Sequence, residues 1–469
     1  MLSHLATKTP KTISPNILGR IKRNLRPLPP FDFKPAPYYG PSKEQVLKDR
    51  LAHVHPSVLL YYEKPIMIVQ GQMQYLFDEK GKRYLDGIAG IVTVSVGHSH
   101  PRVIEAAKKQ LEKLAHTTTI YLHPNITEYC KLLASKLPKK LSHIYLVNSG
   151  TEANELATQM SRLHTGNYDM VALRNCYHGM GAAMGLTAHS TWKQPVPQGF
   201  GIKHALNPDL YQGAFREDDP NAVEKYLKHL EHLILTGTAG QVAGYIAEPI
   251  QGVGGAVVMP KGYLKNAYKI IRSHGGICIS DEVQTGFGRT GESYWGFQKD
   301  DPDLVPDIVT MAKGIGNGQP MGAVATTKEI AQSMSGAIHF NTFGGNPVSC
   351  AIGQAVLEAI EEDGLQENCR VTGSYLIKEL KRLQRKHNII GQVRGKGLMV
   401  GVELVKDRKT REPASAETKK VAELMKDNGV LIAKGGLYGN VIRIKPPMCF
   451  NKLDVDFLVD VLDYSLSKL

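Results

Sequence analysis

The sequence has 469 residues, 42% of them hydrophobic, and a formal net charge of +13. A chain of this length and composition can bury a large core and should divide into two or three domains. Its six cysteines are scattered without paired spacing, which argues against a disulfide framework or a zinc site and for a reducing compartment. No apolar run approaches the ~20 residues that span a bilayer, so we expect no membrane segment.

Much of the positive charge lies at the N-terminus. Residues 1–31 contain six basic side chains and no acidic one, and so contribute +6 of the +13. A basic, acid-poor segment with several Ser and Thr is typical of a mitochondrial transit peptide. The alternative, a disordered arm that binds nucleic acid, lacks an accompanying stacking-aromatic motif. We therefore expect residues 1–41 to be a transit peptide followed by a Pro-rich tether, with no nucleic-acid partner.

Residues 42–94 predict an N-terminal segment that packs with a smaller C-terminal domain. A helix is predicted from Ser42 to His53 with Ser42 as its N-cap, and strands around Ile66–Gln70 and Gln74–Asp78. The stretch Gly87 to Gly97 is apolar, uncharged and rich in glycine, which suits the wall of a cleft. The histidines that follow have no third ligand nearby, so no metal site is expected.

The strand Ile144–Val147 leads into a turn of small residues and then directly into a helix. Ser149, Gly150 and Thr151 occupy this turn, where free backbone N–H groups and two hydroxyls could hold an anion. An ordinary helix cap explains either hydroxyl alone. The sequence is not a P-loop, because GxxxxGK[ST] does not occur.

Two further strands deliver polar residues at the same predicted edge. Met170–Arg174 leads to Tyr177 and His178, and Gly244–Ala247 leads to Glu248. An aromatic ring at a strand end could cover the face of a planar ligand. Packing is the commoner role of a tyrosine taken alone.

The most informative stretches are two strands that end on opposite charges. The first ends on Asp281 and continues into a glycine-rich loop with Gln284; the second, residues 306–312, ends on Lys313. Ligands of open α/β sheets bind at the carboxyl ends of the strands. Pyridoxal phosphate needs such a pair, a lysine for its aldehyde and a carboxylate for its ring nitrogen. The alternatives are a solvated lysine and a structural salt bridge.

The alternation of strands and helices from about residue 95 to 345 predicts a three-layer α/β domain with a mostly parallel sheet. Residues 346–469 predict a smaller α+β domain that begins with helices over Pro347–Glu362 and Gly373–His387. Arg443 lies on its last strand. A guanidinium there could bind a substrate carboxylate, and an exposed strand arginine is the alternative.

Six motifs occur in one order: Asn148–Ala153, Tyr177–Gly179, Ala247–Gly252, Asp281–Gly291, Thr310–Gly314 and Asn341–Pro347. Together they resemble the class III pyridoxal-phosphate-dependent aminotransferases over about residues 45–465. The resemblance implies the fold-type I architecture of these transferases. Within the family, Gly90–His98, Met311–Pro320 and His339–Pro347 are most similar to the mitochondrial alanine–glyoxylate aminotransferase 2 subgroup.

The resemblance implies pyridoxal 5'-phosphate as cofactor and a role for each motif. Lys313 would hold the cofactor and shuttle a proton, Asp281 would pair with the ring nitrogen, and Gln284 would lie near the ring hydroxyl. Tyr177 would stack on the ring beside His178.

Other implied roles concern the phosphate and the substrate. The cofactor phosphate would bind Ser149, Gly150 and Thr151, helped by Thr342 of a second subunit. Arg443 would hold the substrate α-carboxylate, and Glu248 would neutralise that arginine for donors whose amine is remote.

The resemblance further implies a mitochondrial matrix homodimer with shared active sites, possibly a tetramer, that acts on small amino acids and 2-oxo acids. Alanine or 3-aminoisobutyrate would donate to glyoxylate or pyruvate by a ping-pong route. Ile91 and Val92 stand where ornithine-type members carry a tyrosine, which disfavours diamino acids. Alternatives are an ω-amino-acid aminotransferase, a phospho-lyase acting on an amino-alcohol phosphate, and a nucleic-acid-binding protein on a retired scaffold. The intact set of Lys313, Asp281 and Gln284 argues against the last.

Overall fold

The structure is a computed structural model that describes residues 25–196, 199–336 and 338–469. Most of the predicted transit peptide, residues 1–24, lies outside the described residues. The end of the predicted transit segment is packed on the fold: Arg26 pairs with Asp456 at 3.1 Å and Asp460 at 2.8 Å. Within the described ranges, every helix is too short or too polar to cross a membrane.

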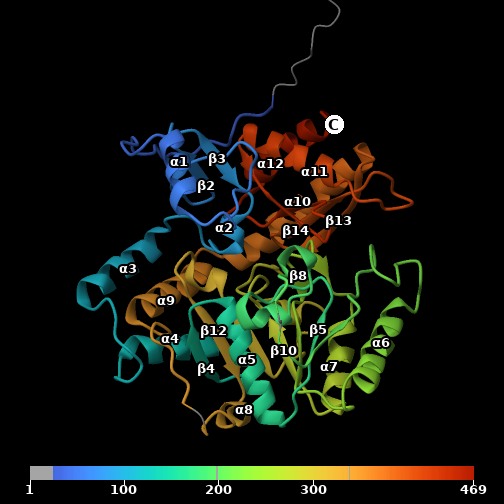
Figure 1. Ribbon diagram of the computed structural model, residues 1–469. Helices are drawn as coiled ribbons and strands as arrows, with labels where there is room; N and C mark the ends of the chain where they lie inside the picture. Colours follow the sequence, from blue (N-terminus) through green and yellow to red (C-terminus); the bar gives the residue numbers. More distant parts are fainter. Residues whose placement is uncertain (1–24, 197–198, 337) are drawn as a thin grey trace, which may run out of the picture.

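A seven-stranded sheet forms the centre of the molecule (Figure 1). Its strands, in spatial order, are β4 (His143–Val147), β12 (Gly322–Thr326), β11 (Ile308–Met311), β10 (Ile277–Asp281), β7 (Gly244–Ala247), β5 (Met170–Leu173) and β6 (Ile202–Ala205). Strand β12 runs antiparallel to both of its neighbours, and the other pairs are parallel. The prediction of a mostly parallel sheet is confirmed.

Helices cover both faces of this sheet. Helix α5 (Gly150–Thr165) packs on one face, and α6 (Ala222–Gly237) and α7 (Tyr263–Ser273) pack on the other. Side chains of a strand alternate between the two faces. In β5, Met170 and Ala172 accordingly join the core under α5, whereas Val171 and Leu173 join the core under α6 and α7. The three-layer architecture follows from this pattern of buried apolar residues.

The N-terminal strands lie beside the C-terminal elements. Strands β1 (Ile68–Gln72), β2 (Tyr75–Asp78) and β3 (Arg83–Asp86) form a sheet whose fourth member is β15 (Val430–Leu431), parallel to β3. A second small sheet has the order β13 (Ile390–Lys396), β14 (Met399–Leu404), β17 (Val441–Ile444) and β16 (Ala433–Gly435). Figure 1 shows these elements, blue and red, together above the large sheet.

The C-terminal part holds four long helices: α9 (Pro347–Glu362), which packs against α3 (Pro101–Lys113) and α4 (Pro124–Ser135), and α10 (Leu365–Lys386), α11 (Ser415–Asp427) and α12 (Lys452–Leu466), which lie with the small sheets. The bounds of α9 are those predicted. The predicted start of the next helix at Gly373 is wrong, because Gly364, with φ of +60°, makes the break instead. Gly373 lies inside α10, where a Cβ would be 2.2 Å from the carbonyl oxygen of Gly397. That glycine serves close packing and not a turn.

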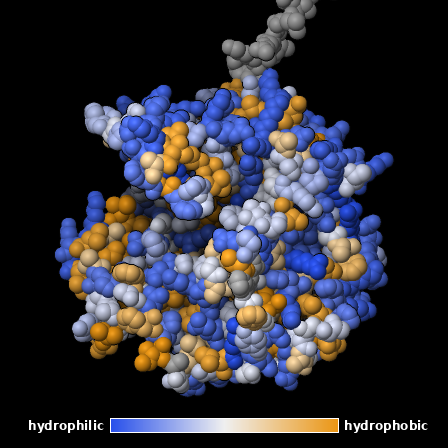
Figure 2. Space-filling view, in the orientation of Figure 1, coloured by the Kyte–Doolittle hydropathy of each residue, from blue (hydrophilic) through white to orange (hydrophobic). Residues whose placement is uncertain are grey.

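Helix α1 (Lys43–His53) begins as predicted. The hydroxyl of Ser42 accepts a hydrogen bond from the backbone N–H of Gln45 at 3.2 Å, which is the geometry of an N-cap. The surface is mixed in polarity; Figure 2 shows hydrophobic residues gathered at the upper left, over the N-terminal elements, and at the left, towards α3 and α4.

Candidate active site

The loops after β4, β5, β7, β10 and β11 enclose a cavity of about 270 Å³. Its lining includes Thr151, Tyr177, Glu248, Asp281 and Lys313. Each of these residues follows or ends a strand whose carboxyl end lies at the same edge of the sheet. The cavity therefore lies where ligands of open α/β sheets bind.

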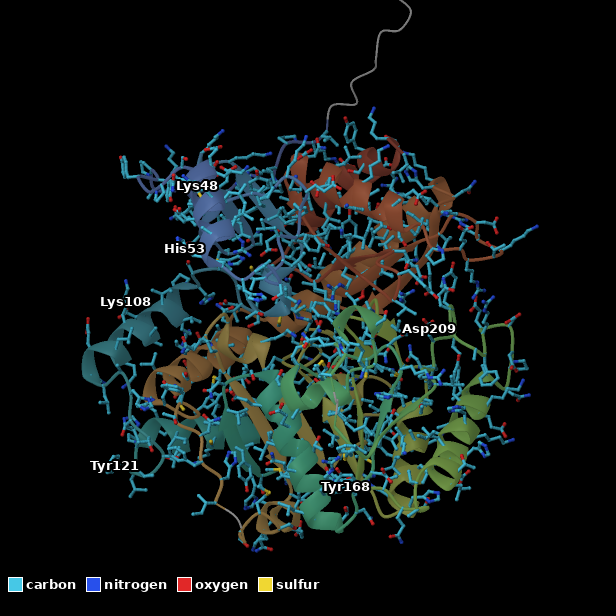
Figure 3. All side chains as sticks on the ribbon, in the orientation of Figure 1. Lys48, His53, Lys108, Tyr121, Tyr168 and Asp209 are labelled. Carbon is cyan, nitrogen blue, oxygen red and sulfur yellow. The ribbon has the colours of Figure 1, made fainter. Side chains whose placement is uncertain are left out.

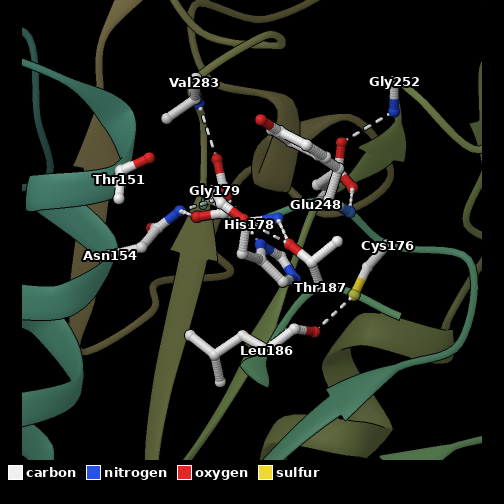
Figure 4. Close-up of polar contacts among 12 residues, drawn as sticks. Thr151, Asn154, Cys176, His178, Gly179, Leu186, Thr187, Glu248, Gly252 and Val283 are labelled. Atoms are coloured by element: carbon white, nitrogen blue, oxygen red, sulfur yellow. Dashed lines mark hydrogen bonds and ion pairs between the residues drawn. The ribbon is translucent and has the colours of Figure 1, made fainter. Parts of the chain in front are cut away.

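Asp281, the last residue of β10, is held by three hydrogen bonds. Its carboxylate accepts from His178 Nδ1 at 2.7 Å, from Asn154 Nδ2 at 2.9 Å and from the backbone N–H of Val283 at 3.0 Å. These donors are visible around the carboxylate in Figure 4. The side chain is 3% exposed, so the carboxylate is fixed in position and turned towards the cavity.

The imidazole of His178 holds the carboxylate of Asp281 through their hydrogen bond. Burial alone lowers the pKa of His178, but Cys176 and Asp281 together raise it well above its ordinary value. The imidazole Nδ1 therefore carries a proton that it donates to the carboxylate. Among the described residues, Nε2 of this ring is buried and has no hydrogen-bond partner.

Lys313 follows β11 by two residues and lines the cavity opposite the carboxylates. Strands β10 and β11 pair with Asp281 in register with Thr310, which brings the lysine and the aspartate to neighbouring strand ends. Burial lowers the pKa of Lys313, and the charges of Asp281 and Glu248 oppose this effect. Its φ of +52° is uncommon for a residue with a side chain, and such strain gathers at functional sites.

The N-terminus of α5 forms one wall of the cavity. The hydroxyl of Ser149 accepts from the backbone N–H of Glu152, which caps the helix; among the described residues the N–H groups of Gly150 and Thr151 have no acceptor and can bind a ligand. The helix dipole favours an anion here. A Cβ at Gly179 would lie 2.5 Å from Thr151 Oγ1, so only glycine lets this loop close on the turn.

Glu248 is buried beside the cavity, but it is bonded to backbone and not to a cation. Its carboxylate accepts from the N–H groups of Tyr177 at 3.1 Å and Gly252 at 2.8 Å. Burial raises its pKa. Within the described ranges Glu248 binds backbone N–H groups and Arg443 binds backbone carbonyls, so the pairing of the two for donors with a remote amine stays a prediction.

Arg443 lies on β17, behind the loop that follows Glu248. Its Nε donates to the carbonyl of Lys434 at 2.9 Å and its Nη1 to the carbonyl of Gly252 at 3.4 Å. The side chain is 8% exposed, so the alternative of an exposed strand arginine is wrong. Burial lowers its pKa. It does not itself line the cavity.

Tyr177 and His178 reach the site in different ways. Tyr177 lines the cavity and packs edge-on against Trp192, with ring centroids 5.4 Å apart. His178 also borders the cavity, although its strongest contact is to Asp281.

Besides Arg443, three predicted residues are not brought to this cavity. Thr342 and Ile91 are exposed, and Val92 is buried elsewhere. The residues from Ala89 to Val92 all have positive φ, a left-handed turn that directs Thr93, and neither Ile91 nor Val92, to the cavity. Sequence patterns do not reveal such a turn, because β-branched residues rarely adopt it.

Two residues were not predicted. Asn154 donates to Asp281, and it stands one turn after Thr151, so its helix position was a usable signal. Lys445 donates to Gln284 Oε1 at 3.0 Å while wholly buried. Its only signal was a lysine between an apolar strand and two prolines.

These residues fit pyridoxal phosphate. The free N–H groups of Gly150 and Thr151 suit its phosphate, the fixed carboxylate of Asp281 suits a protonated ring nitrogen, and Lys313 supplies an amine. The N–H groups at the start of α5 suit an anionic group, and the carboxylate of Asp281 suits a cationic one, so the cavity fits a ligand that is anionic at one end and cationic at the other. Among the described residues, no group of three or more His, Cys, Asp or Glu could hold a metal ion.

Comparisons with known proteins agree with the geometry. The profile of the family described as aminotransferase class-III matches residues 61–466. The chain is 54% identical over 443 residues to alanine–glyoxylate aminotransferase 2 homolog 2, mitochondrial, of Arabidopsis thaliana, covering 94% of this chain and 91% of that protein. It is 46% identical over 462 residues to alanine–glyoxylate aminotransferase 2, mitochondrial, of Homo sapiens, covering 94% and 90%.

Solved structures with the same fold include two enzymes of different activity. A phospholyase from Arthrobacter in complex with phosphoethanolamine aligns with a TM-score of 0.85 at 36% identity, over 90% of this chain and 100% of that chain. A thermostable (S)-enantioselective omega-transaminase from Thermomicrobium roseum aligns with a TM-score of 0.85 at 32% identity, over 92% and 99%. The fold is that of the pyridoxal-phosphate-dependent transaminases, and pyridoxal phosphate is the cofactor. The enzyme transfers amino groups between amino acids and oxo acids, and the chain belongs to the class III aminotransferases.

Proposed function

We propose that the enzyme moves an amino group from alanine, or from a small β-amino acid such as 3-aminoisobutyrate, to glyoxylate or pyruvate. The observation that carries this proposal is the placement of Lys313 and Asp281 at adjacent strand ends in one cavity. The names of the relatives from Arabidopsis thaliana and Homo sapiens support alanine and glyoxylate as the substrate pair. The donor leaves as an oxo acid before the acceptor enters, which gives ping-pong kinetics.

Pyridoxal phosphate supplies an aldehyde carbon that takes up an amine and a ring that withdraws electrons from it. Lys313 would hold that carbon and would act as the general base once the substrate amine has taken its place. Because burial lowers its pKa, more of its Nζ is neutral near neutral pH and can accept the proton from the donor's amine-bearing carbon. Asp281, fixed by His178 and Asn154, keeps the ring nitrogen protonated.

Arg443 is the proposed partner of the substrate carboxylate in both half-reactions. A guanidinium has five N–H donors, and those of Nε and Nη1 bind carbonyls. The Nη2 group stays available for a carboxylate oxygen. Glu248 would form an ion pair with Arg443 only after a side chain turns, because its carboxylate accepts from two backbone N–H groups.

We also propose a homodimer with shared active sites, possibly a tetramer, in which Thr342 of one subunit contacts the cofactor phosphate of the other. Thr342 is exposed and flanked by Phe340 and Phe343, which are 56% and 62% exposed. Tyr121, at the left edge of Figure 3, lies in a loop whose Ile120 and Leu122 are also exposed. Apolar side chains in such numbers mark an interaction surface. Light scattering should give the mass of two or four chains, and a single-chain mass would contradict the proposal.

The division of the chain and its location are proposals of the same kind. Residues 42–94 and 346–469 share one sheet and flank a large domain over 95–345, which the pairing of β3 with β15 supports. The basic N-terminus and the mitochondrial names of the relatives support import into the mitochondrial matrix. A fluorescent fusion of the full chain, compared with one lacking residues 1–41, tests this.

A panel of amino donors tests the proposed substrates. Alanine, 3-aminoisobutyrate and ornithine, each with glyoxylate and with pyruvate, are compared by kcat/KM on the cofactor-loaded enzyme. We expect alanine with glyoxylate, or 3-aminoisobutyrate with pyruvate, to be the best pair. A clear preference for ornithine would favour an ω-amino-acid aminotransferase and would contradict the proposal.

A phospho-lyase is the second candidate, because the Arthrobacter phospholyase aligns over its full length. The higher identity to the aminotransferases favours amino transfer. Phosphoethanolamine separates the two activities: release of inorganic phosphate without a keto acceptor would establish the lyase, whereas pyruvate formed from alanine and glyoxylate establishes the transferase.

A further inference from the structure

Lys445 is a buried lysine to which the proposed chemistry assigns no role. It directly follows β17 and is 0% exposed. Its Nζ donates to the carbonyl of Gly252 at 3.0 Å and to Gln284 Oε1 at 3.0 Å. Its backbone N–H donates to the carbonyl of Gly87 at 2.7 Å, so both main chain and side chain are held. Burying an amine is costly unless it is hydrogen-bonded, so these contacts are what keep it there.

The contact fixes which way the amide of Gln284 faces. A side-chain amide has an oxygen that accepts and an NH2 group that donates, whereas the ammonium of a lysine can only donate. The oxygen of Gln284 must therefore face Lys445, and its NH2 group is left to face the cavity that Gln284 lines. If the amide were turned, its NH2 group would face the N–H groups of the ammonium, and no hydrogen bond could form between two donors.

Close packing holds the amide group of Gln284 in place. A Cβ at Gly252 would lie 2.3 Å from Gln284 Oε1, so the amide occupies space that only a glycine leaves free. The N–H of Gly252 donates to Glu248 at 2.8 Å, so Lys445 binds the same residue whose N–H holds that carboxylate. Lys445 thus joins two loops of the cavity to the strand that carries Arg443.

Both protonation states of Lys445 allow these contacts, but only the ammonium excludes the turned amide, because the lone pair of a neutral amine accepts hydrogen bonds. Burial and the charge of Arg443 lower the pKa of Lys445 well below its ordinary value. An ammonium has three N–H donors and a neutral amine has two. Either number is enough for the two acceptors, the carbonyl of Gly252 and Gln284 Oε1.

We propose that Lys445 is a positioning residue that holds the amide of Gln284 with its NH2 group towards the cofactor, where it donates to the oxygen on the cofactor ring. The proposal rests on the proposed function, in which Gln284 lies near that ring oxygen. Lys445 does not touch the reacting atoms and acts through Gln284.

The test compares Lys445→Met with a matched control. Methionine keeps an unbranched chain but has no N–H donor, so the cofactor Kd should rise on the order of tenfold. The pH at which the visible absorption of the cofactor-loaded protein changes should also shift, because the ring oxygen loses its hydrogen-bond donor. Lys426→Met is the control, because Lys426 is likewise buried, at 3% exposed, but bonds to Lys64 and Glu423 away from the cavity. It should change only the stability.

A double-mutant cycle separates positioning from a general structural role. If Lys445 acts through Gln284, Lys445→Met should add little to the rise in Kd once Gln284→Ala is present. Full additivity would overturn the proposal. Lys445→Leu, which likewise has no N–H donor, replaces Lys445→Met in the cycle if the latter does not fold.

The cycle also keeps the two hypotheses apart. If Gln284→Ala leaves both the Kd and the absorption unchanged, the proposed place of Gln284 beside the ring oxygen fails. If Gln284→Ala weakens binding and Lys445→Met does not, the role of Lys445 alone fails.

Discussion

The carboxylate of Asp281 should be needed for catalysis far more than for folding. Replacing it with asparagine keeps the shape of the side chain but removes its charge and turns an NH2 group towards one of its three donors. The hydrogen bond from His178 Nδ1, at 2.7 Å, is the shortest of the three. Losing one bond to a charged group lowers the free energy of unfolding by about 1.5–3 kcal/mol. Losing one fixed charge in an active site lowers kcat by about 10²–10³-fold.

Glu282 offers a control on the neighbouring residue. Its carboxylate is also wholly buried, but it accepts from Thr285, Gly296 and Phe297 and does not line the cavity. Glu282→Gln should therefore lower the free energy of unfolding by a similar amount while kcat stays near that of the wild type.

The assay measures denaturant unfolding and steady-state alanine–glyoxylate transfer on cofactor-saturated Asp281→Asn and Glu282→Gln. Equal losses of kcat in the two variants would show that burial of any carboxylate at this strand end is what matters. Wild-type kcat in Asp281→Asn would refute the assignment of Asp281 to the ring nitrogen.

Three other changes test separate parts of the site. Lys313→Ala removes the amine that holds the cofactor, so turnover and the visible absorption of the lysine-bound cofactor should both vanish; survival of either contradicts the role of Lys313. Arg443→Ala removes the proposed carboxylate partner, so KM for glyoxylate should rise on the order of 10–100-fold with a smaller change in kcat, and an unchanged KM would exclude that role. Burial raises the pKa of Glu248 above its ordinary value of 4.5; its contribution to stability is then full below pH 4.5 and is lost as pH rises through the raised pKa. Glu248→Gln should flatten the stability–pH curve in that window, and an unaltered slope in urea unfolding series would contradict the raised pKa.

The sheet and its charged edge could be predicted because their signals are local. An apolar strand that ends on Asp281 or Lys313 is readable from a few residues, and parallel strands bring such ends together. The bounds of β7 and α9 were predicted correctly for the same reason.

Features that depend on distant residues were missed. The left-handed turn from Ala89 to Val92 follows Gly87, whose N–H donates to the carbonyl of Leu431 and whose carbonyl accepts from the N–H of Lys445. Lys445 acquires its partners only when β17 packs behind the loops of Gly252 and Gln284. Neither arrangement has a periodicity or a spacing that a sequence displays.

The central claim is that Lys313 is the residue that carries the cofactor. Borohydride reduction of the cofactor-loaded enzyme, followed by proteolysis and mass spectrometry, tests it most directly. The account predicts that the mass of the reduced cofactor is found on the peptide that contains Lys313, and that the visible absorption is bleached. Cofactor mass on the peptide of Lys445, the other buried lysine of the site, or on neither peptide, would contradict it.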